Sequence, residues 1–354
     1  MRGTGRLALL LLAGFGLYEW RRWATPAVAL SPAPPPPARQ VRISILVPAW
    51  NAVADLPAFM ATYIGLSWGD RQLILCVGGD DGSVTLARHY ATRDVVVLEQ
   101  MPGEGKQHAL ERCLDASDGD VIVLTDIDCR LTDAVLQNLL GTLQQSGTAA
   151  VSGASRPLAE QAHLPLVRSH YATERATLPT EAVPIQGLLG RSAAIHREVL
   201  ESTRALTVPA MSGTDYTLAK TLLRAGHQIT FAPGHEIESE YPGGLRTYAH
   251  KQARWLRNVY LLGRRYDADA EVMAVKRTLT VSYALVLTSA AGLWFRPLAV
   301  LPLLAVVHAA VTRTRFQRSA GLKPSLIGSL LHVIADQWAA LKATRDIILN
   351  QTPW

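Results

Sequence analysis

Short β-type runs alternate with helical segments between residues 41 and 124, and this alternation constrains the fold more than any other feature. The apolar runs are residues 41–47, 72–77, 95–98 and 121–124, with helical segments at 83–92 and 105–116. Strands that alternate with helices predict an α/β fold: an open, mostly parallel, Rossmann-like sheet flanked by helices. In such a sheet, ligands bind in the crevice beyond the carboxyl ends of the strands.

Polar and glycine-rich residues follow three of these runs, at the point where each strand ends. Residues 48–51 (PAWN) follow the first run, and residues 79–83 (GDDGS) follow the second. Asp126 and Asp128 follow the fourth. Because parallel strands end at the same edge of a sheet, we expect these residues to converge on one site.

Asp126 and Asp128 are two carboxylates separated by one apolar residue at the end of a buried-type strand. Like charges held this close need a cation between them. A small number of hard oxygen ligands suits Mg²⁺ or Mn²⁺, with a phosphate completing the coordination shell. The alternative interpretation is that Asp128 caps a helix beginning near Thr132 and that Asp126 is incidental.

Two further loops carry candidate ligand-binding groups. Asp80 and Asp81 precede Gly82, and this pattern is typical either of an ordinary Asp-Gly turn or of a carboxylate that accepts hydrogen bonds from a nucleobase or ribose. Residues 103–106 (GEGK) lack the spacing and the Ser/Thr of a Walker loop, which excludes a P-loop. Lys106 at the start of a helix can still lie near a diphosphate.

Two later segments have both a chemical and a purely structural interpretation. Asp215 opens a helix that runs to residues 224–226, either as an acidic residue favoured by the helix dipole or as a general base. Residues 251–255 (KQARW) predict either a basic helix face at a membrane surface or a diphosphate grip. In the second case Gln252, Arg254 and Trp255 would hold the diphosphate and stack on a base or sugar.

The excess apolar content lies near the two ends of the chain. Residues 7–20 have arginines on both sides and predict an uncleaved membrane anchor. Residues 278–295 and 297–312 predict a membrane hairpin or, alternatively, two buried core helices. The basic residues that follow at 313–323 indicate a cytoplasmic flank. Residues 325–348 have the pattern of an amphipathic, interfacial helix.

The net charge of +6 and the pI near 9.3 do not indicate a nucleic-acid partner. The arginines gather beside apolar segments and within residues 242–277, where anionic lipid headgroups are the simpler partner. The three cysteines have no CxxC spacing, so the sequence predicts neither a zinc site nor a disulfide framework, and it fits a reducing compartment.

The motifs together, in this order, resemble a family-2 glycosyltransferase of the GT-A fold. The matching stretches run from "ISILVPAWN" through "GGDDGS", "GEGKQHAL", "TDID" and "GTDYTLAKTLLRAG" to "KQARW", and they span residues 41–258. The resemblance is closest to the membrane-attached branch that includes cellulose, chitin and hyaluronan synthases and ceramide glucosyltransferase.

The resemblance implies roles for particular residues. Asp81, together with Asp80, would bind the uracil-ribose end of a UDP-sugar, near the backbone of Pro48 and Ala49. Asp126 and Asp128 would be the Asp-x-Asp motif, with Asp128 the more direct metal ligand and Asp126 nearer the donor sugar. Asp215 would be the catalytic base. The remaining donor-binding residues implied are Lys106, Gln252, Arg254 and Trp255.

The chain departs from the family pattern at three positions. Lys251 stands where the signature before Arg254 has glutamine, so the role of Gln252 is in doubt. Ala52 and Thr214 stand where acidic residues are frequent, and the second change removes a carboxylate next to Asp215. The small number of apolar segments also argues against the export of a long polymer.

The resemblance implies an inverting, metal-dependent transferase, and the apolar and basic segments place it at the cytoplasmic face of the inner or plasma membrane. It would move a sugar from a nucleotide-sugar to a lipid or glycan acceptor. The predicted parts are an anchor (1–23), a Pro-rich linker (24–40), a GT-A domain (41–265) and a membrane-associated region (266–354). The alternatives are a nucleotidyltransferase, although residues 48–56 lack its Gly-rich basic loop, and an inactive membrane scaffold.

Overall fold

The computed structural model describes residues 2–24, 35, 38–145, 147–210 and 212–349. Most of the predicted Pro-rich linker lies outside these residues. The chain divides into two compact units, which we describe separately. The sheet unit comprises the described residues of Ser31–Leu158 and Pro179–Glu240, and the helical unit those of Met1–Leu30, Ala159–Leu178 and Tyr241–Gln351.

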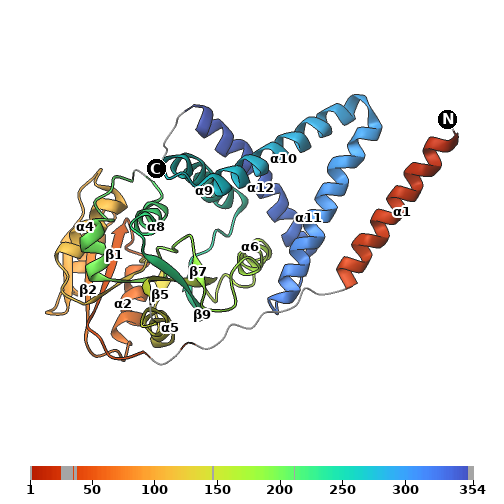
Figure 1. Ribbon diagram of the computed structural model, residues 1–354. Coiled ribbons are helices and arrows are strands. Elements are labelled where there is room, and N and C mark those ends of the chain that lie inside the picture. Colours follow the sequence, from red (N-terminus) through yellow and green to blue (C-terminus); the bar gives the residue numbers. More distant parts are fainter. Residues whose placement is uncertain (1, 25–34, 36–37, 146, 211, 350–354) are drawn as a thin grey trace. The chain divides into compact units, whose positions relative to one another are not determined.

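The sheet unit is built on one sheet, which contains nine strands within the described residues (Figure 1). The strands are β1 (Ile43–Trp50), β2 (Arg71–Gly78), β3 (Val95–Glu99), β4 (Val121–Leu124), β5 (Cys129–Arg130), β6 (Thr148–Pro157), β7 (Pro184–Ile185), β8 (Ala193–His196) and β9 (Gln228–Ser239). Their order is β3-β2-β1-β4-β8-β6-β9-β5, with β7 paired to β9. The four predicted strands and both predicted helices between them are confirmed.

Most strands of the sheet run in one direction. Strands β3, β2, β1 and β4 are parallel neighbours, β8 is antiparallel to β4 and β6, and β9 is again parallel to β6. The chain order reverses between β1 and β4, because β2 and β3 lie on one side of β1 and β4 on the other. This switch point is where an open α/β sheet offers a crevice for a ligand.

Helices cover both faces of the sheet because alternate strand residues point to opposite sides. Ile45, Leu75 and Val123 face a core formed with α2 (Leu56–Ile64), α3 (Ser83–Arg88) and α5 (Asp133–Leu143). Leu46, Ile74 and Ile122 face a second core formed with α4 (Gly105–Asp115), α7 (Arg197–Thr203) and α8 (Thr214–Arg224). The predicted α/β sheet flanked by helices is therefore confirmed.

The helical unit contains the remaining described elements. They are α1 (Arg2–Ala24), α6 (Pro165–Arg175), α9 (Leu245–Arg265), α10 (Asp269–Trp294), the 3-10 turn η1 (Arg296–Ala299), α11 (Val300–Ser319) and α12 (Leu326–Ile348). The predicted domain boundary at residue 265 stays a prediction. Helix α9 belongs to the helical unit, where it packs against α10 and α12.

A buried polar cluster joins four helices of this unit. His332 of α12 lies 3.0 Å from the Ser169 hydroxyl through Nδ1 and 2.8 Å from the Tyr248 hydroxyl through Nε2. Tyr248 donates to Asp336 at 2.7 Å, and Arg313 of α11 also donates to Asp336. Since the Tyr248 proton goes to Asp336, the His332 Nε2–H donates to Tyr248 and Nδ1 accepts from Ser169.

One helical stretch among the described residues, Arg296–Ser319, is long and apolar enough to cross a membrane. Its length and composition alone support this, and a core helix of a soluble protein can have the same properties. Within its most apolar segment, 17% of the residues are buried. Helices α10 and α11 are joined at Arg296-Pro297, as predicted. Helix α10, however, is not apolar enough along its length to count as a candidate membrane span. The membrane hairpin and the N-terminal anchor stay predictions.

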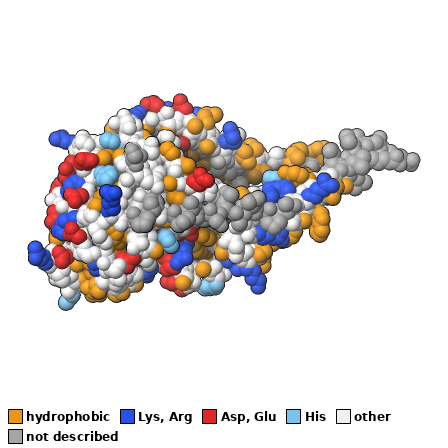
Figure 2. Space-filling model, turned by 60° about the horizontal axis from the view of Figure 1, so that its bottom comes forward, with side chains coloured by type: hydrophobic (Ala, Val, Ile, Leu, Met, Phe, Trp, Pro, Cys, Tyr) orange, Lys and Arg blue, Asp and Glu red, His pale blue; other side chains and the backbone are white. Residues whose placement is uncertain are grey.

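Large apolar side chains are exposed at the junction of α10 and α11. The exposed fractions of Leu293 and Trp294 are 84% and 94%, and Phe295 and Leu303 are about 60% exposed. Figure 2 shows apolar side chains on the visible face of the molecule beside Lys and Arg side chains. Exposing several large apolar side chains together to water costs free energy. This junction is therefore suited to contact with a membrane or a protein partner.

Candidate active site

The loops that follow β1 and β2 are held together by hydrogen bonds. Asn51 adopts a left-handed conformation with φ of 50°, and its side-chain oxygen accepts from the backbone N–H of Asp80 at 2.9 Å. Gly79 lies directly against Asn51: a Cβ at residue 79 would fall 1.9 Å from the Asn51 Oδ1. Glycine is therefore required at position 79 for this side chain to bridge the two strand ends.

Asp81 is exposed, but its carboxylate organises the same two loops. One oxygen accepts from the backbone N–H of Val53 at 3.0 Å, and the other accepts from the Ser83 N–H at 2.9 Å and from the Ser83 hydroxyl. These hydrogen bonds, with that from the Ser83 hydroxyl the strongest, lower the pKa of Asp81. Asp81 is thus a fixed anion at the edge of the sheet, and Asp80 beside it is exposed.

Pro48 and Ala49 lie within β1 rather than in the loop after it. They are in register with Cys76 and Val77 of β2, whereas the β1–β4 ladder already ends at Leu46↔Leu124. The last residues of β1 therefore extend beyond the end of β4. The β1–β4 ladder thus ends at Leu124, two residues before Asp126.

Lys106 and Asp126 form an ion pair at this point. The Lys106 Nζ, from the first turn of α4, lies 2.5 Å from Asp126 Oδ1, just beyond β4. Burial lowers the pKa of the Lys106 ammonium, but its hydrogen bond and charge interaction with Asp126, and the charge of Asp215, raise it, and the net shift is upward. Lys106 is therefore a firmly charged cation next to the paired carboxylates.

Asp128 does not cap a helix. Helix α5 begins at Asp133, and the residue that caps it is Thr132, whose hydroxyl accepts from the Val135 N–H. Asp128 instead lies next to the buried thiol of Cys129, with the Sγ 3.5 Å from Asp128 Oδ1. Burial and then the charges of Asp128 and Asp126 raise the pKa of that thiol. The capping interpretation of Asp128 was wrong.

Asp215 lies in the first turn of α8, as predicted, after the left-handed Gly213 (φ 77°). Its Oδ1 accepts from the Tyr216 N–H at 2.9 Å. A Cβ on Gly190 would come within 3.1 Å of the Asp215 Cβ, so glycine permits the loop before β8 to approach this carboxylate closely. The charge of Asp215 also raises the pKa of Lys106, so the two groups interact electrostatically.

The residues of the predicted diphosphate grip lie on α9 of the helical unit. Arg254 is exposed and Trp255 is 54% exposed, while Ala249, Ala253 and Leu256 form the buried face of the helix. Gln252 is half-buried. The side chains of Arg254 and Trp255 thus do not belong to the hydrophobic core and are available for a ligand.

Asp126 and Asp128 are the groups suited to a divalent cation. The described residues include no cluster of three or more His, Cys, Asp or Glu side chains arranged to hold a metal. An ion at this position would therefore take its other ligands from water or phosphate oxygens, which is usual for Mg²⁺. One Asp126 oxygen is paired with Lys106. The assignment of Asp128 as the more direct metal ligand stays a prediction.

Sequence reasoning missed one residue of the site, Arg191, and treated Ser83 only as part of the turn after β2. Ser83 is fully buried, and its hydroxyl accepts from the Ala52 N–H at 2.8 Å while it donates to Asp81. Arg191 lies close enough to Cys129 that its charge opposes the raised pKa of that thiol, so a second cation lies near the paired carboxylates. No local pattern marks Arg191, because it acts on a partner far away in the sequence. Ser83 shares a local turn with Asp81, and only its bond to the Ala52 N–H is long-range.

Comparison with known proteins gives a matching family, a related sequence and a solved structure of similar fold. The model of the family described as "Glycosyltransferase like family 2" matches residues 38–258. An N-acetylglucosaminyltransferase of Azorhizobium caulinodans is 23% identical over 239 residues, which are 62% of this chain and 60% of that relative. A mannosyltransferase of Pyrobaculum calidifontis, solved in complex with GDP-Man and Mn²⁺, has a similar fold, with a TM-score of 0.57 and 18% identity over 98% of both chains.

The fold is an open, mostly parallel α/β sheet flanked by helices, similar to that of the mannosyltransferase, and it confirms the predicted GT-A fold class. Because the family model covers more than half of the chain, the protein belongs to glycosyltransferase-like family 2. Its placement in the membrane-attached branch stays a prediction.

Proposed function

We propose that the protein is an inverting glycosyltransferase that moves a sugar from a nucleotide-sugar, expected to be a UDP-sugar, to a hydroxyl of a lipid or glycan acceptor. The observation that carries this proposal is the Lys106–Asp126 ion pair just beyond β4, at the switch point of the sheet. Asp128 follows two residues later, and the charge of Asp215 acts on Lys106. Glycosyl transfer needs three functions. In this proposal Lys106 stabilises the charge of the leaving group, Asp126 and Asp128 position the donor through a metal ion, and Asp215 removes the proton of the acceptor.

The nucleoside end of the donor would lie at the ends of β1 and β2. Asp81 is fixed by Val53 and Ser83, and Asp80 is exposed beside it, so carboxylate oxygens are presented to ribose hydroxyls or a uracil N–H. Pro48 and Ala49, in the part of β1 that extends past the β1–β4 ladder, are proposed to approach the nucleoside through their backbone. In this proposal Asp81 both shapes the loop and contributes to binding of the nucleoside.

The diphosphate would lie between Lys106 and Asp128. The Lys106 ammonium stabilises the negative charge that develops on the departing diphosphate. A Mg²⁺ or Mn²⁺ ion held by Asp128, with Asp126 nearby, would supply further positive charge to the same oxygens when bound. The mannosyltransferase with the similar fold was solved with Mn²⁺, which supports a divalent ion. Gln252, Arg254 and Trp255 are proposed to act at the diphosphate and the acceptor.

The chemical step would be a single displacement. A new bond forms between the acceptor oxygen and the anomeric carbon of the sugar, while the bond from that carbon to the diphosphate breaks. Asp215 takes the proton of the acceptor hydroxyl, and the nucleoside diphosphate leaves with the bonding electrons. Attack opposite to the leaving group inverts the anomeric configuration.

The acceptor is proposed to be presented at a membrane, with the active site in the cytoplasm. The candidate span at Arg296–Ser319 and the exposed apolar side chains at the junction of α10 and α11 support this location. Arg313, Arg315 and Arg318 at the end of α11 fit a cytoplasmic end.

The first test is the release of the nucleoside diphosphate by membranes that contain the full chain. UDP-glucose, UDP-galactose, UDP-GlcNAc, UDP-GlcA and GDP-mannose are each supplied with Mn²⁺, Mg²⁺ or EDTA. We expect release with one donor that requires the metal. If none of the donors is turned over or bound, the inactive-scaffold alternative replaces this proposal.

Asp215→Asn separates the chemistry from donor binding. Because the amide cannot accept the acceptor proton, we expect turnover to fall by about 10²- to 10⁴-fold while donor affinity stays near that of the native protein. Asp120→Asn, at an exposed carboxylate of the same unit, is the matched control and should be fully active. A near-normal rate in Asp215→Asn would reject Asp215 as the base.

A further inference from the structure

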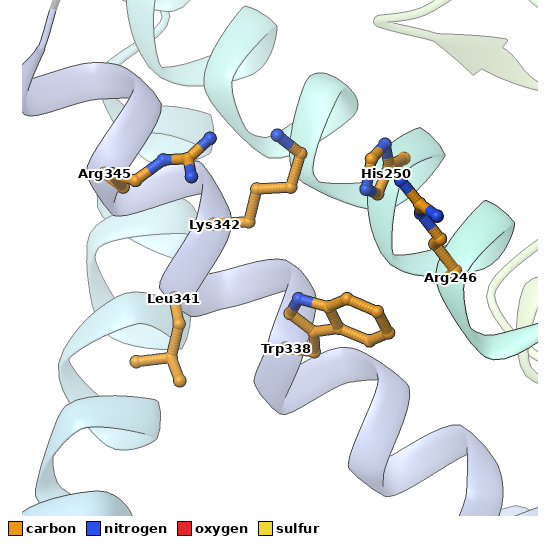
Figure 3. A pocket seen from close by; sticks show the side chains of 6 residues that line it. All are labelled: Arg246, His250, Trp338, Leu341, Lys342 and Arg345. Atoms are coloured by element: carbon orange, nitrogen blue, oxygen red, sulfur yellow. The ribbon is translucent and has the colours of Figure 1, made fainter.

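A cavity with a basic lining lies between α9 and α12, within the helical unit. Its volume is about 580 Å³, which is in the usual range for a ligand site. The residues that line it are Arg246, His250, Trp338, Leu341, Lys342 and Arg345 (Figure 3). None of these six is acidic.

Helix periodicity explains why these six side chains meet. Arg246 and His250 are four residues apart on α9 and therefore share one face. Trp338, Leu341, Lys342 and Arg345 follow the spacing i, i+3, i+4 and i+7 on α12, which is again one helix face. Figure 3 shows the side chains of Lys342 and Arg345 extending from α12, with His250 and Arg246 on the opposite helix.

The cations of the lining outnumber the acid that pairs with them. Asp346, only 2% exposed, accepts from Lys342 at 3.1 Å and from Arg345 at 3.0 and 3.2 Å. This pairing holds both cations in place but uses only part of their N–H groups, since lysine has three and arginine five. None of the described residues pairs with Arg246, which is exposed. The cavity therefore carries excess positive charge and spare donors.

The opposite part of the lining is apolar. Trp338 is 42% exposed, and the His250 ring meets its indole edge-on at a centroid distance of 6.4 Å. Leu341 adds an aliphatic wall beside the indole. A free phosphate ion would gain nothing from these groups. A ligand that carries a phosphate on an apolar chain would use both halves of the lining.

We propose that this cavity binds the phosphate headgroup of an anionic membrane lipid, with Arg246, Lys342 and Arg345 on the phosphate and Trp338 and Leu341 along the start of the acyl region. The helical unit also contains the candidate membrane span and the exposed apolar junction of α10 and α11, so lipid is the phosphate source that this unit meets. The site is independent of the proposed transfer reaction and would anchor or position the helical unit at a lipid surface.

Binding is tested with the full chain purified in a neutral detergent and titrated with dioctanoyl phosphatidic acid, dioctanoyl phosphatidylcholine or inorganic phosphate. Microscale thermophoresis gives the Kd. We expect phosphatidic acid to bind at least about tenfold more tightly than either of the others, because only it combines an uncompensated phosphate with apolar chains. Equal binding of inorganic phosphate would reject a lipid ligand, and equal binding of phosphatidylcholine would reject recognition of charge.

Arg246→Glu tests the location of the site. Arg246 holds no other group in place, so the variant should fold, and we expect phosphatidic acid to bind at least about tenfold more weakly. Trp338→Ala should weaken the lipid without changing the weak binding of inorganic phosphate. Lys276→Glu, an exposed position on α10 with the same change of charge, is the matched control and should bind normally. An equal loss in Lys276→Glu and Arg246→Glu would show general electrostatic attraction and overturn the proposal.

Discussion

At the scale of single residues, Lys106 and Asp126 show how a polar pair is held ready for an anionic ligand. Their side chains lie 2.5 Å apart but are half-exposed, so the pair is open to a donor. An ammonium next to a carboxylate can exchange one partner for a phosphate without losing its charge. We therefore expect Lys106 to act on the leaving group and contribute little to stability.

Lys106→Gln should lower kcat/KM for the donor by about 10²-fold, because one preorganised positive group is lost at the developing negative charge. The measurement is steady-state release of the nucleoside diphosphate over a range of donor concentrations. Arg88→Gln is the control, since it removes a cation from the exposed Arg88–Glu99 pair on the same unit. An unchanged kcat/KM in Lys106→Gln would show that Lys106 does not act on the leaving group.

At the scale of elements, the segment from β4 to α5 separates a structural residue from a functional one. Thr132 caps α5, while Asp128, four residues earlier, contributes no cap and lies at the edge of the sheet. The two residues should therefore differ in what their loss affects. A substitution of Thr132 acts on the helix, and a substitution of Asp128 acts on the metal-dependent chemistry.

Thr132→Ala should reduce the free energy of unfolding by about 0.5–2 kcal/mol, because the N–H of Val135 loses its acceptor, and it should leave turnover nearly intact. Asp128→Asn should have the opposite profile, with native-like stability and little metal-dependent turnover. Chemical denaturation and the donor-release assay measure the two effects. Loss of stability without loss of activity in Asp128→Asn would contradict the assignment of Asp128 as metal ligand.

At the scale of the whole molecule, the two units are stabilised in different ways. The sheet unit has apolar cores on both faces of its sheet. The helical unit also has a buried polar cluster in which His332 is 2% exposed. Burial, as the largest effect, lowers the pKa of His332 to about 3; Arg313 and His170 also lower it, while Asp336 and Glu174 raise it. His332 is therefore neutral in the folded protein.

The stability of the helical unit should depend on pH through this histidine. In the unfolded chain a histidine binds a proton below about pH 6.5, whereas folded His332 does not until about pH 3. The unfolded state thus binds more protons in this window, and stability falls with falling pH by up to about 1.4 kcal/mol per unit. Unfolding of the full chain in detergent from pH 7 to 5 measures the slope, which should be shallower in His332→Gln. An unchanged slope would contradict burial of a neutral His332.

The sequence alone determined the alternation of strands and helices, the positions of Asp126, Asp128 and Asp215 at element ends, and the family to which the chain belongs. These features could be predicted because they depend on short-range periodicity and on motifs read in order. The same reasoning left Asp128 open between a cap and a ligand, since both explanations fit a carboxylate just before a helix.

Only the tertiary structure decided which groups meet. Lys106 pairs with Asp126 across 20 residues, Asp81 reaches the Val53 amide across 28, and the α9–α12 cavity joins Arg246 to Trp338 within one unit. The structure also joins Ala159–Leu178 with the described residues of Tyr241–Gln351 in one compact unit. Such contacts depend on how strands are ordered in the sheet and how helix faces pack, and these are set by the summed burial of distant side chains. A short stretch of sequence does not determine how many distant side chains pack together. The residue pairs that carry function can therefore be identified only in the folded structure.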